Sequence, residues 1–226
     1  MSDAPVPNDY YEHPRPEVVD CVPLSARNVL DVGCASGALG HSLKLARPEV
    51  QVRGVEPVAA QAERARAVLD DVLHGGADDP LPSHWPAPEC VIFADVLEHL
   101  VDPWSTLRRY RSILKPGGTL VASIPNVAHR VVLRGLFRMR WDYTDFGILD
   151  RTHLRFFTRD TAVELVESCG FQIRSIGRTT EGLGRGLFSK KVRDVLAKEN
   201  GSRRVFPRPL AWLIDAYTVQ FLIVAE

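Results

Sequence analysis

The chain has 226 residues, of which 45% are hydrophobic and 25% charged, and its 28 basic side chains balance 28 acidic ones. This composition indicates a globular protein and excludes a disordered or fibrous one. A duplex-binding domain is usually basic, so the net charge of +0 gives no sign of a nucleic-acid partner. The length suits one domain, and we expect a single domain over residues 1–226.

Neither end of the chain carries a membrane signal. Residues 1–12 lack the basic start and apolar core of a signal peptide, and the apolar stretch 210–225 is interrupted by Asp215 and Gln220. The four cysteines form no CxxC pair and lie in or beside apolar segments, where buried free thiols are common. We therefore expect a reduced, cytoplasmic protein with no transmembrane segment and no structural zinc.

Short apolar runs alternate with helical patterns along the chain. The expected strands are 29–32, 50–56, 71–73, 90–95, 119–124, 171–176 and 218–225. Most runs do not alternate cleanly, which indicates strands buried on both faces by helices. Helices are expected over 59–72, after the Asp102-Pro103 cap, and from the Thr158 cap to the terminator Gly170. This order predicts a doubly wound α/β fold with a mostly parallel, seven-stranded sheet.

Two segments interrupt this rhythm. Residues 126–157 are longer than a connector needs, and we expect them to form a lid for an acceptor after the fifth strand. Their stretch "VVLRGLFRMRWDY" is either a solvated helix face or a contact for an anionic acceptor such as a nucleotide-linked sugar. Residues 177–209 form a basic insertion before the last strand, with eight basic and two acidic side chains over 185–208. That insertion is either solvated or contacts an anionic acceptor or membrane surface.

The stretch "VLDVGCASGALG" places three glycines directly behind the first expected strand. Gly33, Gly37 and Gly40 are spaced G-x-x-x-G-x-x-G, which is neither a dinucleotide fingerprint nor a P-loop. Glycines at this point let the backbone turn tightly and approach a ligand, and the following helix offers N–H groups. The first strand of an open α/β sheet lies where ligands bind. We expect a ligand-binding loop here.

Acidic residues lie in or directly after the first, second and fourth expected strands. They are Asp31, Glu56 and Asp95. Glu56 follows the glycine loop by about 20 residues, a separation that suits a carboxylate accepting both hydroxyl protons of a ribose. Together with the glycine loop, the three acids predict a nucleoside pocket without a phosphate anchor.

These motifs resemble the class I S-adenosylmethionine-dependent methyltransferases over about residues 10–176 and 217–226. "VLDVGCASG" is similar to the family's first motif, "GVEP" to its second, "FADVLEHL" to its fourth, "LKPGG" to the turn before the fifth strand, and "QFLIVAE" to its last, antiparallel strand. The resemblance implies S-adenosyl-L-methionine as cofactor and S-adenosyl-L-homocysteine as product. It implies that Asp31 and 33–37 face the methionine part and that Glu56 holds the ribose.

The resemblance also gives a set of expected cofactor contacts. These are Asp31, Gly33, Cys34, Ala35, Gly37, Glu56, Pro57, Asp95, Val96, Tyr11 and Arg15. Tyr11 and Arg15 belong to an N-terminal segment, 1–28, which in related chains folds over the cofactor; here they either close the pocket or cap a helix layer.

The chain departs from the family at two positions. Ala35 replaces a usual glycine, which is acceptable if φ there is below zero. Gly76 stands where an acid usually meets the adenine, and Asp78 or Asp79 could substitute for it.

A hydroxyl acceptor must lose its proton during methyl transfer, and a histidine suits that task. His153, in "FGILDRTHLRFFT", is the favoured base and His99 is the second choice. Similar "DRTHLRFFT" segments occur in methyltransferases resembling those of polysaccharide and natural-product gene clusters, which favours a metabolite or sugar hydroxyl. Glu98 is adjacent to His99, so on a helix the two side chains point about 100° apart and do not easily face one ligand.

Several residues are expected to contact the acceptor. They are Asn126, Trp141, Tyr143, Asp150 and Arg151, although Asp150 and Arg151 could instead fasten their own loop. Magnesium would need converging carboxylates, and the acids at 142, 145 and 150 do not share a helical face. We therefore expect no metal.

The predicted function is O-methylation of a small metabolite or glycan hydroxyl, and a homodimer is left open. The alternative is a non-catalytic partner protein of the same fold that binds or has lost the cofactor. A nicotinamide oxidoreductase is disfavoured because G-x-G-x-x-G is absent, and a nucleic-acid methyltransferase because no base-gripping motif follows the fourth strand.

Overall fold

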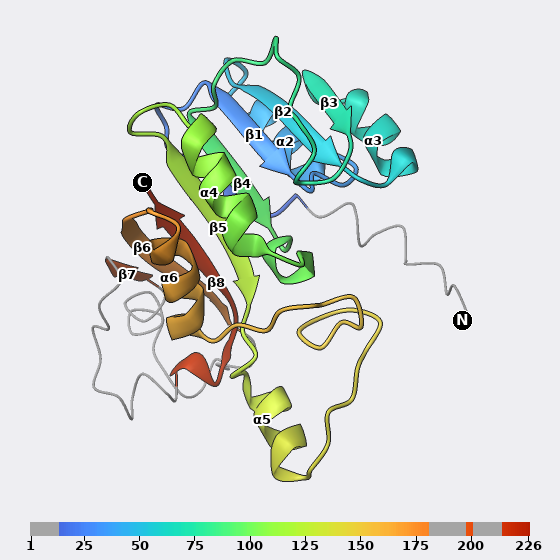
Figure 1. The fold of residues 1–226 in the computed structure, drawn as a ribbon, viewed down its shortest axis with the longest axis vertical. Helices are drawn as coiled ribbons and strands as arrows, with labels where there is room; N and C mark the ends of the chain where they lie inside the picture. Colours follow the sequence, from blue (N-terminus) through green and yellow to red (C-terminus); the bar gives the residue numbers. More distant parts are fainter. Residues whose placement is uncertain (1–13, 181–197, 201–213) are drawn as a thin grey trace. The chain divides into compact units, whose positions relative to one another are not determined.

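The computed structural model describes residues 14–180, 198–200 and 214–226, and these residues form two compact units. The first unit comprises the described residues up to Ala94 together with Ser112–Val121. The second comprises Asp95–Arg111 and the described residues from Ala122 to Glu226. Figure 1 colours the chain from blue to red, and each unit is described by itself below.

The first unit is built on parallel strands, as the uninterrupted apolar runs predict. They are β1 (Asn28–Val32), β2 (Gln51–Glu56), β3 (Asp71–His74) and β4 (Cys90–Ala94), paired in the order β3-β2-β1-β4. Helix α1 (Pro16–Val19) precedes β1, and α2 (Ala38–Ala46) and α3 (Ala59–Arg66) follow β1 and β2. The side chains of β4 from Cys90 to Phe93 are fully buried, as expected for a strand that is covered on both faces.

Helix α3 is shorter than predicted. It ends at Arg66 rather than reaching residue 72. Asp70 explains the difference, because its carboxylate accepts a hydrogen bond from Val52 N at 2.7 Å and pairs with Lys44 Nζ at 2.9 Å. These contacts fix the chain to β2 and α2 directly before β3. Tertiary contacts therefore override the good helix propensity of this stretch.

The second unit contains antiparallel pairing. Its elements are the 3-10 turn η2 (Leu97–His99), α4 (Pro103–Ile113), α5 (Arg130–Phe137), α6 (Arg159–Ser168), β6 (Ile173–Thr180), β7 (Lys198–Asn200) and β8 (Thr218–Ala225). β5 (Thr119–Pro125) starts in the first unit and α4 ends there. The strands are ordered β5-β8-β6-β7, with β6 antiparallel to both neighbours. The last strand is thus antiparallel to β6, as predicted.

The predicted helix ends are confirmed by their hydrogen bonds. Asp102 Oδ1 accepts from Ser105 N at 3.0 Å at the start of α4. Thr158 caps α6 in a reciprocal arrangement with Thr161, and Gly170 after it has φ 89°. Such caps satisfy backbone groups that the helix itself leaves unpaired. The sequence signals therefore placed these boundaries well.

The doubly wound α/β prediction is confirmed by the parallel strands and their intervening helices. Eight strands are described instead of seven, because β7 lies within the segment predicted as a basic insertion. The predictions for Tyr11 and for most of 185–208 fall outside the described residues. Among the described helices, none has the length and apolar character needed to cross a membrane.

Candidate active site

The glycine loop connects β1 to α2 in the first unit. Gly33 and Gly37 have φ values of 75° and 83°, in the left-handed region that glycine adopts without strain. Gly33 N and Cys34 N donate to the carbonyl of Val55, at 2.7 and 3.1 Å. The loop is therefore held against the end of β2, as the predicted ligand-binding turn requires.

Ala35 does not meet the condition stated for it in the sequence. An alanine was acceptable there if φ lay below zero, but φ is 49°. An alanine in the left-handed region is strained by about 1–2 kcal/mol, so the rest of the loop must hold it there. Ala35 N donates to Glu56 Oε2 at 2.9 Å, and this bond fixes the peptide. Ala35 thus adopts the left-handed conformation that a glycine would adopt at this position.

Glu56 ends β2 and is only 5% exposed. Its two oxygens accept backbone hydrogen bonds of 2.9 Å each, Oε2 from Ala35 N and Oε1 from Val58 N. Burial raises the pKa of Glu56, and the two backbone donors act against that shift. Each oxygen keeps a second acceptor position, so a fixed carboxylate can take both hydroxyls of a ribose. Pro57 follows directly and accepts from the His74 ring at 3.2 Å.

Asp31 adds a second buried carboxylate to this end of the first unit. It is 2% exposed, and burial followed by the charge of Glu56 raises its pKa to about 7. The positive charge of Arg15 acts in the opposite direction, although Arg15 also pairs with Glu17 at 2.6 Å. A ligand with cationic groups would relieve this concentration of negative charge. S-adenosylmethionine, with its sulfonium and amino groups, fits these residues, whereas a phosphate does not.

Cys34 packs within the loop through its side chain. A Cβ on Gly54 would lie 2.4 Å from Cys34 Sγ, so the sulfur fills the space that this glycine leaves on β2. Burial raises the pKa of the thiol, which keeps it protonated and unreactive. The Cys34 side chain is therefore used in packing. The cofactor contact predicted for this residue is left to its backbone.

The loop after β3 carries the acids that could replace the missing adenine contact. Gly75 N donates to Glu56 O at 3.0 Å, which ties this loop to the residue predicted to bind the ribose. Asp79 Oδ2 accepts from Gly76 N at 2.7 Å, so the carboxylate folds back toward the position where an acid was expected. Asp79 is thus the better placed of the two candidates, and its adenine contact stays a prediction.

In the second unit, Asp95 and Val96 follow β4. Asp95 has φ 56°, and its Oδ1 accepts from Ser123 Oγ at 3.2 Å and from Gln220 Nε2 at 2.7 Å. A strained residue that is held by several partners is common at functional sites. The cofactor contacts predicted for Asp95 and Val96 stay predictions.

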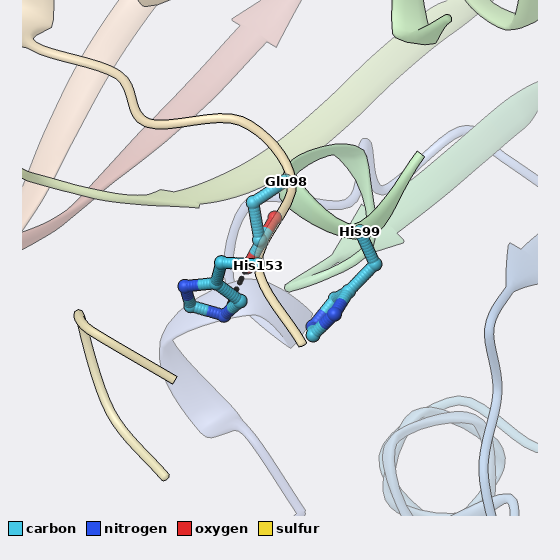
Figure 2. Close-up of side chains that lie close together, drawn as sticks. All are labelled: Glu98, His99 and His153. Atoms are coloured by element: carbon cyan, nitrogen blue, oxygen red, sulfur yellow. Dashed lines mark ion pairs between the residues drawn. The ribbon is translucent and has the colours of Figure 1, made fainter. Parts of the chain in front are cut away.

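His153 and Glu98 are brought together by backbone hydrogen bonds. Leu154 N and Arg155 N both donate to the carbonyl of Glu98, at 2.8 and 2.9 Å. His153 Nε2 then lies 3.9 Å from Glu98 Oε1, with both side chains almost fully buried. Figure 2 shows the two side chains beside His99, whose ring meets the His153 ring edge to face with centroids 4.7 Å apart.

This cluster corrects the expectation that Glu98 and His99 do not easily face one ligand. One ligand atom from each of Glu98, His99 and His153 lies within 4.8 Å of the other two. Residues 97–99 form a single 3-10 turn, in which adjacent side chains still diverge by about 120°, so the ligand atoms of Glu98 and His99 come together at the ends of their side chains. Carboxylates alone were weighed as metal ligands in the sequence, so this mixed cluster was missed.

Hydrogen bonds define which ring nitrogens carry protons. His153 Nδ1 lies 3.0 Å from the carbonyl of Ile148, which can only accept, so Nδ1 is the donor and Nε2 holds the lone pair. His99 Nδ1 lies 3.3 Å from Thr152 O and 3.1 Å from Thr152 Oγ1, whose own proton goes to Asp150 Oδ1 at 2.7 Å. Burial lowers the pKa of His153, so this ring favours its neutral form.

Three of the residues predicted to contact the acceptor bond to backbone or loop groups in the structure, and their acceptor contacts stay predictions. Asn126 is fully buried, donating to Asp215 O and Thr218 O and accepting from Ala128 N. Asp150 accepts from Thr152 N and Oγ1, and Arg151 pairs with Asp145 at 2.5 Å. The loop-fastening alternative therefore describes Asp150 and Arg151.

Trp141 and Tyr143 take part in an aromatic group beside His153. Trp141 meets Tyr143 with ring centroids 6.4 Å apart and Phe156 with centroids 5.1 Å apart. Phe156 in turn lies 6.2 Å from the His153 ring. Phe156 was not among the predicted contacts, although it lies in the "DRTHLRFFT" segment. The second unit thus places an aromatic surface next to two histidines.

The fold and the glycine loop are those of a nucleoside-binding α/β protein, and the second unit brings Glu98, His99 and His153 together. A family model described as "Methyltransferase domain" matches residues 11–176. The chain therefore belongs to the methyltransferase domain family. It is a methyltransferase that uses S-adenosylmethionine, and the alternatives of a nicotinamide oxidoreductase and a non-catalytic partner are set aside.

Curated relatives and solved structures agree with this assignment. A "Ubiquinone biosynthesis O-methyltransferase" of Aromatoleum aromaticum is 25% identical over 178 residues, covering 70% of this chain and 75% of that protein. A "tRNA 5-carboxymethoxyuridine methyltransferase" of Escherichia coli is 33% identical over 129 residues, covering 54% and 48%. A SAM-dependent methyltransferase structure from Thermotoga maritima has a TM-score of 0.62 at 19% identity, covering 92% and 86%.

Proposed function

We propose that this enzyme methylates a hydroxyl oxygen on a small acceptor with a flat apolar face, such as an aromatic ring or a sugar. The observation that carries this proposal is the placement of His153. Its Nε2 lone pair is fixed by the Ile148 hydrogen bond, and its ring lies beside Phe156 and Trp141. The aromatic rings provide a surface for a flat acceptor, and His153 provides a base that can take the proton of its hydroxyl.

The roles of the cofactor-binding residues follow from the first unit. Glu56 takes the ribose hydroxyls, while Asp31 and the backbone of 33–37 receive the methionine part. Bound S-adenosylmethionine supplies a methyl group already activated by the sulfonium. The chain therefore has to align the acceptor and remove its proton rather than activate the methyl group.

His153 acts on the acceptor side. As the acceptor oxygen forms its bond to the methyl carbon and the sulfur–carbon bond breaks, the hydroxyl proton passes to His153 Nε2. Trp141, Tyr143 and Phe156 bind the acceptor ring and exclude water from it. Residues 126–157 form the acceptor lid in this proposal, because Trp141 and Tyr143 belong to that segment.

The relatives support oxygen as the methylated atom. Several are named ubiquinone biosynthesis O-methyltransferases, and these matches cover up to 75% of the relative's length. The match to the tRNA enzyme covers about half of that protein. The described cysteines are all free, three of them buried, which supports our expectation of a reducing, cytoplasmic location.

The test offers the purified enzyme S-adenosylmethionine with three acceptor sets: phenols and catechols, free and nucleotide-linked sugars, and matched amines. Formation of S-adenosylhomocysteine and the methylated product is measured by mass spectrometry. We expect products from a hydroxyl set, with kcat lowered about 10²-fold or more by His153→Gln because proton removal is lost. The exposed control His84→Gln should match the wild type. Turnover of amines alone would contradict the proposal.

A further inference from the structure

The Glu98, His99 and His153 cluster has the donor set of a transition-metal site. It offers two imidazole nitrogens and one carboxylate oxygen, all within 4.8 Å of one another (Figure 2). Two histidines and one carboxylate bind Zn²⁺ in catalytic sites and Fe²⁺ in oxygenases, with further positions open to water or substrate. Mg²⁺ and Ca²⁺ prefer oxygen ligands, so this set does not favour them.

The distances suit a shared ion better than a direct ion pair. His153 Nε2 and Glu98 Oε1 are 3.9 Å apart, beyond the 2.7–3.2 Å of a good hydrogen bond. Two ligands of a tetrahedral ion with bonds of about 2.1 Å lie about 3.4 Å apart. A contraction of about half an ångström would therefore bring these two atoms onto one ion. The side chains are 5% and 1% exposed, so neither is loosely solvated.

The surrounding hydrogen bonds orient both rings as ligands. Histidines that bind metals usually donate their other N–H to a carbonyl or carboxylate, which fixes the ring and its tautomer. His153 Nδ1 contacts the carbonyl of Ile148, and His99 Nδ1 contacts the carbonyl and hydroxyl of Thr152. Asp150 accepts the Thr152 hydroxyl proton and so turns that oxygen toward His99. The Nε2 atom of each histidine therefore keeps its lone pair, which is available to bind a metal ion.

We propose that Glu98, His99 and His153 bind one divalent transition-metal ion of the Zn²⁺ class, which contacts the acceptor hydroxyl. This inference rests on the hydroxyl acceptor of the proposed function and replaces the role of His153 as the base with a role as a ligand of the ion. The ion withdraws electron density from the hydroxyl, so its proton is released to solvent while the oxygen–carbon bond forms and the sulfur–carbon bond breaks. No oxidation or reduction is involved. The acceptors favoured are those whose hydroxyl ionises readily, phenols and catechols above sugars.

The first experiment measures metal binding without turnover. The full-length protein is stripped with a chelator and titrated with Co²⁺, whose visible absorption reports coordination, and Zn²⁺ is then added in competition. We expect one equivalent to bind. His99→Ala, at a half-buried position, should weaken the affinity at least 100-fold, because even the loss of a second-layer contact costs about 10–100-fold. Thr152→Val, which removes one such contact, should weaken it about 10-fold.

Control variants separate a built site from surface binding. His84, an exposed histidine that contacts Asp71 at 3.2 Å, gives the matched control His84→Ala, which should bind as the wild type does. His99→Cys should keep an ion and add a thiolate-to-cobalt absorption band, which a merely structural role for His99 would not produce. Equal Co²⁺ affinity in the wild type and His99→Ala would overturn the proposal, as would equal losses in His99→Ala and His84→Ala.

Turnover by the metal-free protein distinguishes the two proposals. If the stripped enzyme methylates a phenol as fast as the Zn²⁺-loaded enzyme, the metal proposal fails and His153 stands as the base. If activity falls with stripping and returns with Zn²⁺, the metal proposal holds. If neither form methylates any hydroxyl while both bind S-adenosylhomocysteine, the proposed oxygen acceptor is wrong, and the Co²⁺ titration alone decides whether the cluster binds metal.

Discussion

Replacing Asp31 by asparagine should make the protein more stable at high pH while weakening its cofactor binding. The Asp31 carboxyl is 2% exposed, and burial together with the charge of Glu56 raises its pKa from 3.8 to about 7. A carboxyl with a raised pKa in the folded state binds its proton more tightly there than in the unfolded chain. Its contribution to the free energy of unfolding is therefore largest at low pH and is lost as the pH rises toward 7.

The magnitude follows from the two pKa values. Between pH 5 and pH 8, a carboxyl that titrates at about 7 when folded and 3.8 when unfolded removes about 2.5 kcal/mol of stability. An asparagine side chain cannot ionise, so the difference in stability between Asp31→Asn and the wild type should move in favour of the variant by about that amount over this range. We propose that the wild-type protein keeps the costly carboxyl for function, since the same charge attracts the cationic groups of the cofactor.

Urea denaturation at pH 5, 6, 7 and 8 measures this difference directly. Asp20→Asn, at an exposed position after α1, is the matched control and should show no such trend. Titration with S-adenosylhomocysteine at pH 8 should show weaker binding to Asp31→Asn than to the wild type. A stability difference that stays constant from pH 5 to pH 8 would refute the reasoning, because it would mean that Asp31 is not held protonated by burial.

Three further predictions concern single positions. Ala35→Gly should raise the free energy of unfolding by about 0.5–1 kcal/mol, because the strain at φ 49° exceeds the added chain entropy, and chemical denaturation checks this; an unchanged or lower stability would argue against strain there. Glu56→Gln should lower S-adenosylhomocysteine affinity at least tenfold in calorimetry, since the amide nitrogen only donates and so leaves either Ala35 N or Val58 N without its acceptor, whereas Glu63→Gln on the exposed side of α3 should not. Trp141→Ala should raise the acceptor KM and leave S-adenosylhomocysteine affinity unchanged; equal losses in both would place Trp141 outside acceptor binding.

The backbone of the fold was readable from local signals. Each predicted strand appears with its ends shifted by a few residues at most. Short apolar runs that are bounded by turn residues strongly favour buried strands. The caps at Asp102 and Thr158 were equally direct, since each rests on a side chain within three residues of its partner. The end of α3 was not readable, because it depends on Asp70 meeting Val52 and Lys44 from elsewhere in the chain.

The residues predicted to contact the cofactor could be located in the fold from the sequence more easily than those predicted to contact the acceptor, for the same physical reason. Asp31, the glycine loop and Glu56 lie at fixed positions relative to strands, so locating the strands locates them. The positive φ of Ala35 could not be predicted, because the residue type alone indicates that such a φ is unfavourable, while the Glu56 carboxylate that fixes its peptide comes from another strand. The residue type alone indicates the strain of a positive φ, but it does not reveal the hydrogen bond from another strand that holds the peptide in place.

The segment around His153 shows the limit of reading motifs by residue type. Asp150 and Arg151 have the chemistry of substrate contacts, yet their side chains are used by Thr152 and Asp145. Asp150 orients the Thr152 hydroxyl, Thr152 orients His99, and the carbonyl of Glu98 holds the backbone after His153. Asp150 and Thr152 of "DRTHLRFFT" therefore orient the His99 ring, which lies with His153 and Glu98 around a common point. This cluster can be recognised only when residues 98–99 and 150–155 are considered together, since neither segment alone contains both histidines and the carboxylate.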